Sequence, residues 1–220
     1  MSKRGLAKSA FYKKIFNKNY DLISATHHEA GHAISGLLNF IKILVVEAKI
    51  YKDDKVGGYI CFDGLSFGSN SNVEYNNYIA LSEIKLNYAG IAAEKLLLKK
   101  ISGSDISPFF LKWGAGDDIS SAASLIKKFN LAPPGKKRYL FKQNMIKETT
   151  KELDLHWDAV VAVAHLLYKK KQINYNDLKK LLCTKIKNKK FWKRQFKKID
   201  LIFNNTLELD ENSVKSIIFA

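Results

Sequence analysis

The segment from Asp21 to Leu38 constrains the fold more than any other part of the chain, because its small and apolar residues recur every three or four positions. That period predicts an α-helix. The same segment contains the sequence His28-Glu29-Ala30-Gly31-His32. Positions i and i+4 of a helix share a face, so the two imidazoles are placed to bind one metal ion.

Two histidines at this spacing, with a glutamate after the first, are typical of zinc proteases. A bound zinc ion lowers the pKa of its water toward neutrality, and we expect Glu29 to accept the proton as a general base. The metal-activated water would then attack a carbonyl group. Two histidines and a carboxylate also describe the iron site of non-haem oxygenases. The helical spacing and the interposed glutamate favour hydrolysis over that alternative.

A third metal ligand has to come from elsewhere in the chain. The remaining histidines are disfavoured, because one points off the shared face and two lie in a late helix where packing explains them: His27, His156 and His165. Four carboxylates remain as candidates: Glu94, Asp105, Asp117 and Asp118. Asp118 opens a predicted helix after a glycine-rich segment, where its ordinary role would be capping. Glu94 lies on a predicted helix and either binds the metal or accepts a hydrogen bond from a ligating imidazole.

The pattern of the whole chain predicts a mainly α-helical fold with a small β-hairpin or sheet. Helical spacing recurs over six segments: 21–38, 73–98, 118–129, 137–152, 155–171 and 174–183. Residues 41–50 are rich in β-branched side chains and predict a strand, and residues 59–62 predict its returning partner. Residues 51–58 are turn-like, and residues 99–117 are expected to be mainly a loop.

The positive charge of the chain is concentrated at two places. The 220 residues carry a formal net charge of +16, and 46% of them are hydrophobic, which is enough to form a core. Residues 1–20 and residues 185–198 contain six and eight basic residues respectively and no acidic ones, so the remainder is almost neutral. We therefore expect a basic N-terminal arm (1–20), a central domain (21–184) and a basic C-terminal extension (185–220). Basic segments of this kind either hold an anionic partner, such as nucleic acid, or are solvated.

The two cysteines cannot form a disulfide framework, and no segment reads as a membrane span or a signal peptide. A cytoplasmic location is the resulting expectation.

Four segments together resemble one known family. The sequence Ala25-Thr-His-His28-Glu-Ala-Gly-His32-Ala-Ile34 is similar to the zinc-binding helix of the FtsH-type ATP-dependent metalloproteases. Ala89-Gly-Ile-Ala-Ala-Glu94 resembles the family's Gly-Gly-Arg-x-Ala-Glu helix, and Trp113-Gly-Ala-Gly-Asp-Asp118-Ile119 its Thr-Gly-Ala-x-Asn-Asp-[Leu/Ile] segment. The closing helices around Trp157 and Asn176 are also similar. The order and rough spacing agree over about residues 20–182.

The resemblance implies an FtsH-peptidase-like helical zinc metallopeptidase domain. It makes His28, His32 and Asp118 the zinc ligands and Glu29 the general base, and it places Glu94 behind a ligating imidazole. The hairpin from Ile43 to Phe62 would supply the edge strand to which an extended peptide substrate adds. The resemblance also implies a hexameric ring.

The chain departs from the family in the module that precedes the peptidase domain. Only 27 residues precede His28, and the sequence contains no Gly-x-x-x-x-Gly-Lys-[Ser/Thr] loop, so we do not expect this chain to hydrolyse ATP. Asp117 replaces the family's asparagine, and the stretch between Glu94 and Asp118 is longer. Substrates would then either be flexible enough to enter the site unaided or be delivered by a separate ATPase or adaptor.

Three hypotheses for the function follow. The first is an ATP-independent zinc metalloendopeptidase that acts on unfolded or partner-delivered polypeptides. The alternative is a catalytically idle binding or scaffold protein that keeps the peptidase fold and uses its basic ends to bind nucleic acid or a complex. A third hypothesis is hydrolysis of a non-peptide amide.

Overall fold

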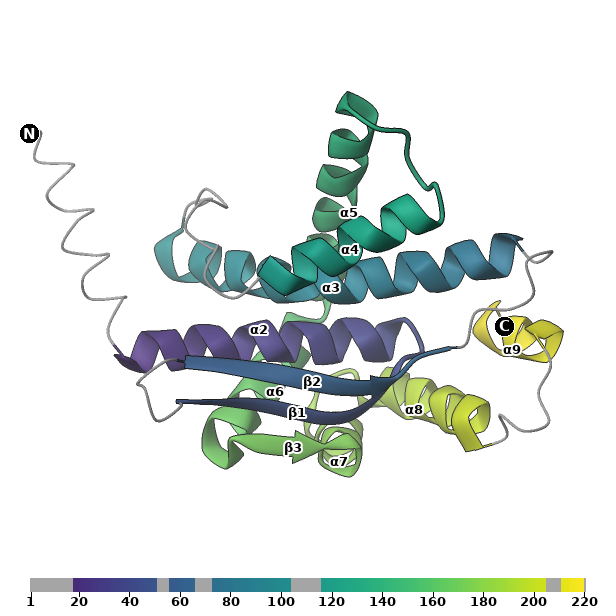
Figure 1. Cartoon of the computed structure of the whole chain (residues 1–220). Coiled ribbons are helices and arrows are strands. Elements are labelled where there is room, and N and C mark those ends of the chain that lie inside the picture. Colours follow the sequence, from purple (N-terminus) through teal and green to yellow (C-terminus); the bar gives the residue numbers. More distant parts are fainter. Residues whose placement is uncertain (1–17, 51–55, 66–72, 104–115, 205–210, 220) are drawn as a thin grey trace, which may run out of the picture.

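Helix α2 (Lys18–Leu38) runs through the middle of the molecule, and the other elements are arranged around it (Figure 1). The computed structural model describes residues 18–50, 56–65, 73–103, 116–204 and 211–219. In these residues, eight helices and a small antiparallel sheet confirm the mainly helical class. The elements after α2 are β1 (Lys42–Ile50), β2 (Val56–Asp63), α3 (Val73–Ser102), α4 (Gly116–Lys128), α5 (Lys136–Leu155), α6 (Trp157–Lys170), β3 (Gln172–Asn174), α7 (Tyr175–Lys185), α8 (Lys189–Asn204) and α9 (Glu211–Phe219).

The main hydrophobic core surrounds α2. Helix α3 packs along one side of α2, while the sheet and α6 pack on the other (Figure 1). Apolar side chains from nine of the described elements share this core, among them Ile34, Leu37, Ile43, Val46, Ala89, Val163 and Trp192. A smaller cluster joins α3 to α4 and α5 through Ile84, Tyr88, Ala122, Ile126 and Met145. Both helices that carry the predicted site, α2 and α4, are therefore held against α3.

The sheet has the strand order β2-β1-β3, and both pairings are antiparallel. Val46 in the central strand lies opposite Ile60 of β2 and Ile173 of β3. Of the described strands, β2 thus lies at one edge of the sheet. The hairpin predicted from residues 41–62 is confirmed, but β2 begins at Val56. Gly57 and Gly58, which we expected in the turn, are strand residues.

The predicted helices all occur, with boundaries that differ by a few residues. Helix α3 continues to Ser102, beyond the expected end at 98. Asn174 caps α7: its side chain accepts a hydrogen bond from the Asp177 backbone N–H, and the Asp177 carboxylate accepts one from the Asn174 N–H. The sequence did not predict β3, α8 or α9. Residues 1–17 of the predicted basic arm (1–20) and residues 104–115, including Asp105, lie outside the described residues.

Helix α8 is part of the main core. Trp192, Phe196 and Ile199 are buried on one face of this helix, at the spacing of a single helical stripe. Gln195 donates a hydrogen bond from Nε2 to the backbone oxygen of Leu37 at the end of α2, over 2.7 Å. The charge pattern sets residues 185–220 apart as an extension, whereas the apolar face of α8 packs on the same core as the central domain. None of the described helices combines the length and hydrophobicity that crossing a bilayer requires.

Candidate metal centre

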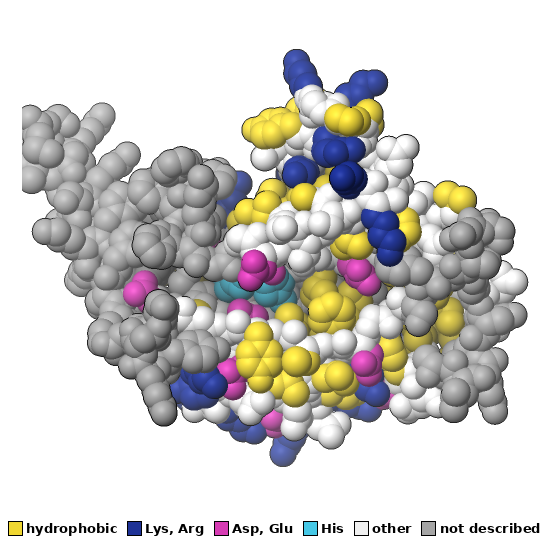
Figure 2. All heavy atoms as spheres, in the orientation of Figure 1, with side chains coloured by type: hydrophobic (Ala, Val, Ile, Leu, Met, Phe, Trp, Pro, Cys, Tyr) yellow, Lys and Arg dark blue, Asp and Glu magenta, His cyan; other side chains and the backbone are white. Residues whose placement is uncertain are grey.

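Helix α2 places His28 and His32 next to each other. Their rings meet edge to face with centroids 4.7 Å apart, as the i, i+4 spacing predicts. Both side chains are largely buried. Figure 2 nevertheless shows histidine side chains reaching the surface between acidic side chains, so this point of the molecule is accessible from outside.

Asp118 meets this histidine pair from α4, 86 residues beyond His32. It lies in the first turn of α4, where a carboxylate is favoured by the helix dipole. Its Oδ2 atom is 3.1 Å from Nε2 of His28 and 3.3 Å from Nε2 of His32. One donor atom from each of the three residues lies within 4.8 Å of the others, a spacing that can hold a metal ion. Two imidazoles and a carboxylate are a donor set used by catalytic zinc sites, so these residues fit zinc.

Each imidazole is oriented by a hydrogen bond on its far side. Nδ1 of His28 lies 2.7 Å from Oε1 of Glu94 on α3. Nδ1 of His32 lies 2.7 Å from the backbone oxygen of Leu86. Leu86 is also on α3, about two helical turns before Glu94. Both acceptors require Nδ1 to carry hydrogen, which directs both Nε2 atoms toward Asp118. Such outer hydrogen bonds are the usual way in which proteins orient metal-binding histidines.

Gly90 is the position at which α3 comes closest to the metal-binding residues of α2. A Cβ atom on Gly90 would lie only 2.3 to 2.6 Å from three atoms of the His28 ring. Any side chain at position 90 would therefore displace the imidazole. The absence of a side chain lets α3 approach His28 closely enough for Glu94, one turn further along, to reach its Nδ1 atom.

The carboxylates beside His28 change the ionisation of the metal-free site. Burial alone would lower the pKa of His28, but the hydrogen bonds and charges of Asp118 and Glu94 outweigh it and raise this pKa to about 10. For Asp118, burial alone would raise the pKa, and the two histidines overcome that effect and hold it well below its usual range. Both shifts indicate a cluster whose charges stabilise one another.

Glu29 is buried beside the histidine pair, on the side of the edge strand β2. A Cβ atom on Gly58 would lie 2.6 Å from Cγ and 2.8 Å from Oε1 of Glu29, so this carboxylate lies directly against the strand backbone. Burial raises the pKa of Glu29, and the nearby imidazoles only partly oppose this. The structure thus places a basic carboxylate between the donor cluster and β2.

Comparisons with protein-family models and with curated proteins find no match to this chain. Because a fold does not by itself specify an activity, the function has to be inferred from the chemistry of the site.

The other described candidates from the sequence are not among the three donors of the cluster. Asp117 is exposed. His27 stacks on Trp157 with ring centroids 5.8 Å apart. His156 stacks on Phe191 at 5.0 Å, and its pKa is lowered by burial. His165 is exposed on α6.

Sequence reasoning missed three contributors to the site: the Leu86 carbonyl, Gly90 and Gly58. A backbone oxygen leaves no signal in the sequence, because every residue has one. Gly90 was visible within the Ala89-Gly motif, but only the crossing of α2 and α3 shows which side chain it accommodates.

Proposed function

We propose that this chain is a zinc-dependent endopeptidase that hydrolyses peptide bonds of unfolded or partner-delivered proteins. The observation that carries the proposal is the convergence of three donors from two helices, with Nε2 of His28 and His32 at 3.1 and 3.3 Å from Oδ2 of Asp118. Glu29, which is not one of the three donors, is buried beside them. This combination of donors and a separate carboxylate is what hydrolysis at a zinc site requires.

His28, His32 and Asp118 would hold the ion, and Glu94 and the Leu86 carbonyl would keep the two rings in place. When bound, zinc would supply a Lewis acid that activates water and polarises a carbonyl group. Glu29 would hold the proton that leaves the water and return it to the departing amine. Its raised pKa suits this exchange, because a general base works best when its pKa lies near the working pH.

Strand β2 provides a place for an extended peptide. It lies at the edge of the described sheet, and its Gly58 backbone contacts Glu29. A peptide that pairs with β2 through its main chain would run past the general base with little demand on its sequence. Pairing of this kind needs an extended backbone, which supports unfolded or flexible polypeptides as substrates.

The similarity to FtsH-type peptidase domains supports the same proposal from the sequence side. In that family, the residues that match His28, Glu29, His32 and Asp118 perform the roles given above. We infer a peptidase domain of this type. A hexameric ring and a separate ATPase or adaptor are partners implied by the resemblance alone.

One observation favours a second candidate, the non-catalytic binding protein. One face of α8 is buried, and the opposite face carries exposed basic side chains. These are Lys189, Lys190, Lys193, Arg194 and Lys197. A cationic helix face of this kind can bind nucleic acid by neutralising phosphates, and such binding weakens steeply with salt. This surface does not involve the metal-binding residues.

The two candidates are distinguished by substitution of the general base. The zinc-loaded protein should cleave unfolded casein, and Glu29→Gln should abolish cleavage while zinc content stays the same. Glu74→Gln removes an exposed carboxylate from α3 and should leave cleavage unchanged. An inactive wild-type protein that binds zinc, together with salt-sensitive nucleic-acid binding that Glu29→Gln does not alter, would favour the second candidate instead.

A further inference from the structure

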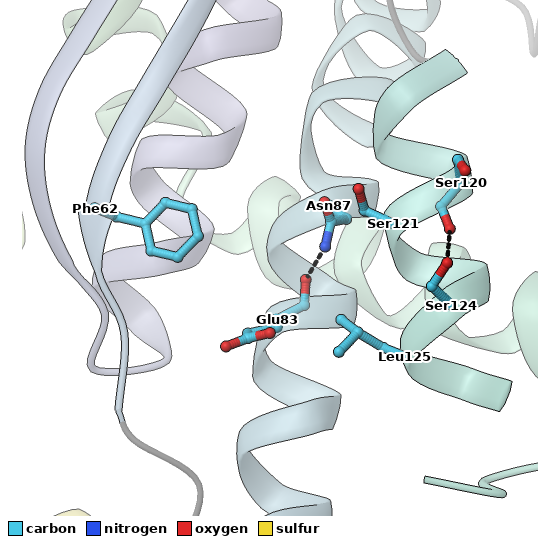
Figure 3. A pocket seen from close by; sticks show the side chains of 7 residues that line it. All are labelled: Phe62, Glu83, Asn87, Ser120, Ser121, Ser124 and Leu125. Atoms are coloured by element: carbon cyan, nitrogen blue, oxygen red, sulfur yellow. Dashed lines mark hydrogen bonds between the residues drawn. The ribbon is translucent and has the colours of Figure 1, made fainter. Parts of the chain in front are cut away.

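An open pocket of about 490 Å³ lies between β2, α3 and α4. Seven residues line it: Phe62, Glu83, Asn87, Ser120, Ser121, Ser124 and Leu125. Figure 3 shows the Phe62 ring on the β2 side of the pocket, with Glu83 and Asn87 opposite on α3 and the serines on α4. None of these residues has a role in the site as described so far.

The pocket continues the same surfaces that build the metal centre. On α4, Ser121 and Leu125 follow Asp118 by three and seven positions, which places all three on one helix face. On α3, Asn87 and Glu83 precede Gly90 by three and seven positions, on the face that meets His28.

Strand β2 shows the same relation. Phe62 follows Gly58 by four positions, so both residues face the same side of the strand. Since one helical turn advances about 5 Å, the pocket begins about one turn from the metal-binding residues. This is within reach of a substrate side chain next to the peptide bond that is cleaved.

The lining combines two apolar side chains and one acidic group with four neutral polar residues. Phe62 and Leu125 supply the apolar surface. Glu83 supplies the only ionisable side chain among the seven lining residues, and its carboxyl is half-buried. Burial raises the pKa of Glu83, and the positive charge of Lys128 offsets part of that effect. A carboxylate in such a position is stabilised further by a cation that enters the pocket.

A long aliphatic stem that ends in a positive charge matches this lining. We propose that the pocket binds the side chain of a lysine or arginine close to the cleaved bond, and that Glu83 selects the positive charge. This inference rests on the proposed peptidase function. The two apolar side chains would hold the stem, while the carboxylate pairs with the ammonium or guanidinium group. A norleucine side chain has a similar stem without the charge, so it isolates the contribution of Glu83.

The test is a defined peptide library cleaved by the zinc-loaded protein, with the products sequenced by mass spectrometry. Lysine and arginine should be enriched at one position within two residues of the cleaved bond. For a matched peptide pair, kcat/KM should be about tenfold higher with lysine than with norleucine, the effect of one charge-assisted hydrogen bond. Glu83→Gln should remove this preference. It should leave kcat/KM for the norleucine peptide and the zinc content unchanged.

The control is Glu74→Gln, which makes the same charge change on an exposed part of α3 and should keep the lysine preference. A lysine preference that persists in Glu83→Gln, or no basic preference in the wild-type protein, would overturn the inference. If the wild-type protein cleaves nothing, peptide binding to Glu29→Gln still tests the pocket. Tighter binding of the lysine peptide that is lost on adding Glu83→Gln supports the pocket, and equal binding of the lysine and norleucine peptides rejects it.

Discussion

The Nδ1 atom of His28 lies 2.7 Å from Oε1 of Glu94, although 66 positions of sequence separate the two residues. This contact forms where α2 and α3 cross, and it turns the other ring nitrogen of His28 toward Asp118. The carboxylate of Glu94 therefore controls the geometry of the donor cluster without belonging to it.

Substitution of Glu94 tests that role. Glu94→Gln keeps the size of the side chain but removes the negative charge that holds the Nδ1 hydrogen of His28. We expect zinc affinity to fall about 10- to 100-fold, the usual effect of losing an outer hydrogen bond to a metal-binding histidine. Competition with a chromophoric chelator measures the change. Glu74→Gln, on an exposed part of the same helix, should not change zinc affinity. Equal zinc affinities in the wild type, Glu94→Gln and Glu74→Gln would contradict a role for Glu94 in the site.

The two neighbouring aspartates of α4 give a direct test of the third ligand. Asp118 is half-buried against the imidazoles, whereas Asp117 is exposed. Asp118→Ala should weaken zinc binding by at least about 100-fold, because a three-ligand site loses its only carboxylate. Asp117→Ala should leave binding within about twofold. Elemental analysis after dialysis measures both, and equal zinc retention in the two variants would refute the assignment of Asp118.

Close packing at Gly90 predicts that an alanine substitution there lowers both stability and zinc affinity. Gly90→Ala would place Cβ within 2.6 Å of the His28 ring, so the ring has to move. We expect a loss of about 1–3 kcal/mol in the free energy of unfolding, as for other overpacked sites, together with weaker zinc binding. Gly116→Ala is the matched control, since a Cβ atom there meets nothing within 4 Å. Urea denaturation and zinc titration of both variants would show whether the difference exists.

Zinc binding should release a proton from His28. The neighbouring carboxylates raise the pKa of His28 to about 10 in the metal-free protein, so the ring is protonated at neutral pH. We expect about one proton to be released per zinc at pH 8, and zinc affinity to rise about tenfold per pH unit between about pH 7 and 9. Calorimetry in buffers of different ionisation enthalpy measures the released proton, and binding without proton release would contradict the charged cluster.

The same proton affects the stability of the metal-free protein. Because the pKa of His28 lies above its unfolded value of 6.5, its stabilising contribution is complete below pH 6.5 and is lost as the pH rises toward 10. In EDTA, the free energy of unfolding should therefore decrease over this range. The decrease should be smaller in His28→Gln, which has no proton to lose.

The parts of the site that sequence analysis predicted are those with local causes. His28 and His32 share a face because of helical geometry alone, and the period of residues 21–38 identifies that helix. Asp118 could be named because it opens a helix within a motif similar to a known family. The spatial meeting of α4 with α2 depends on the packing of both against α3, which no local pattern specifies.

Helix α8 shows how one signal can hide another. Trp192, Phe196 and Ile199 have helical spacing and are buried in the main core, but eight basic residues between 185 and 198 dominated the interpretation of this segment. Long basic side chains cover the outer face of a helix without preventing burial of its apolar face. Strand β3 was missed for a different reason: its three residues are too few for a period, and only pairing with β1 defines it.

The most direct test of the central claim is diffraction from zinc-soaked crystals, measured at the zinc absorption edge. The proposed site predicts one anomalous peak per chain, within bonding distance of Nε2 of His28, Nε2 of His32 and a carboxylate oxygen of Asp118. An empty cluster at saturating zinc, or a peak elsewhere in the chain, would contradict the assignment of these three residues as a metal centre.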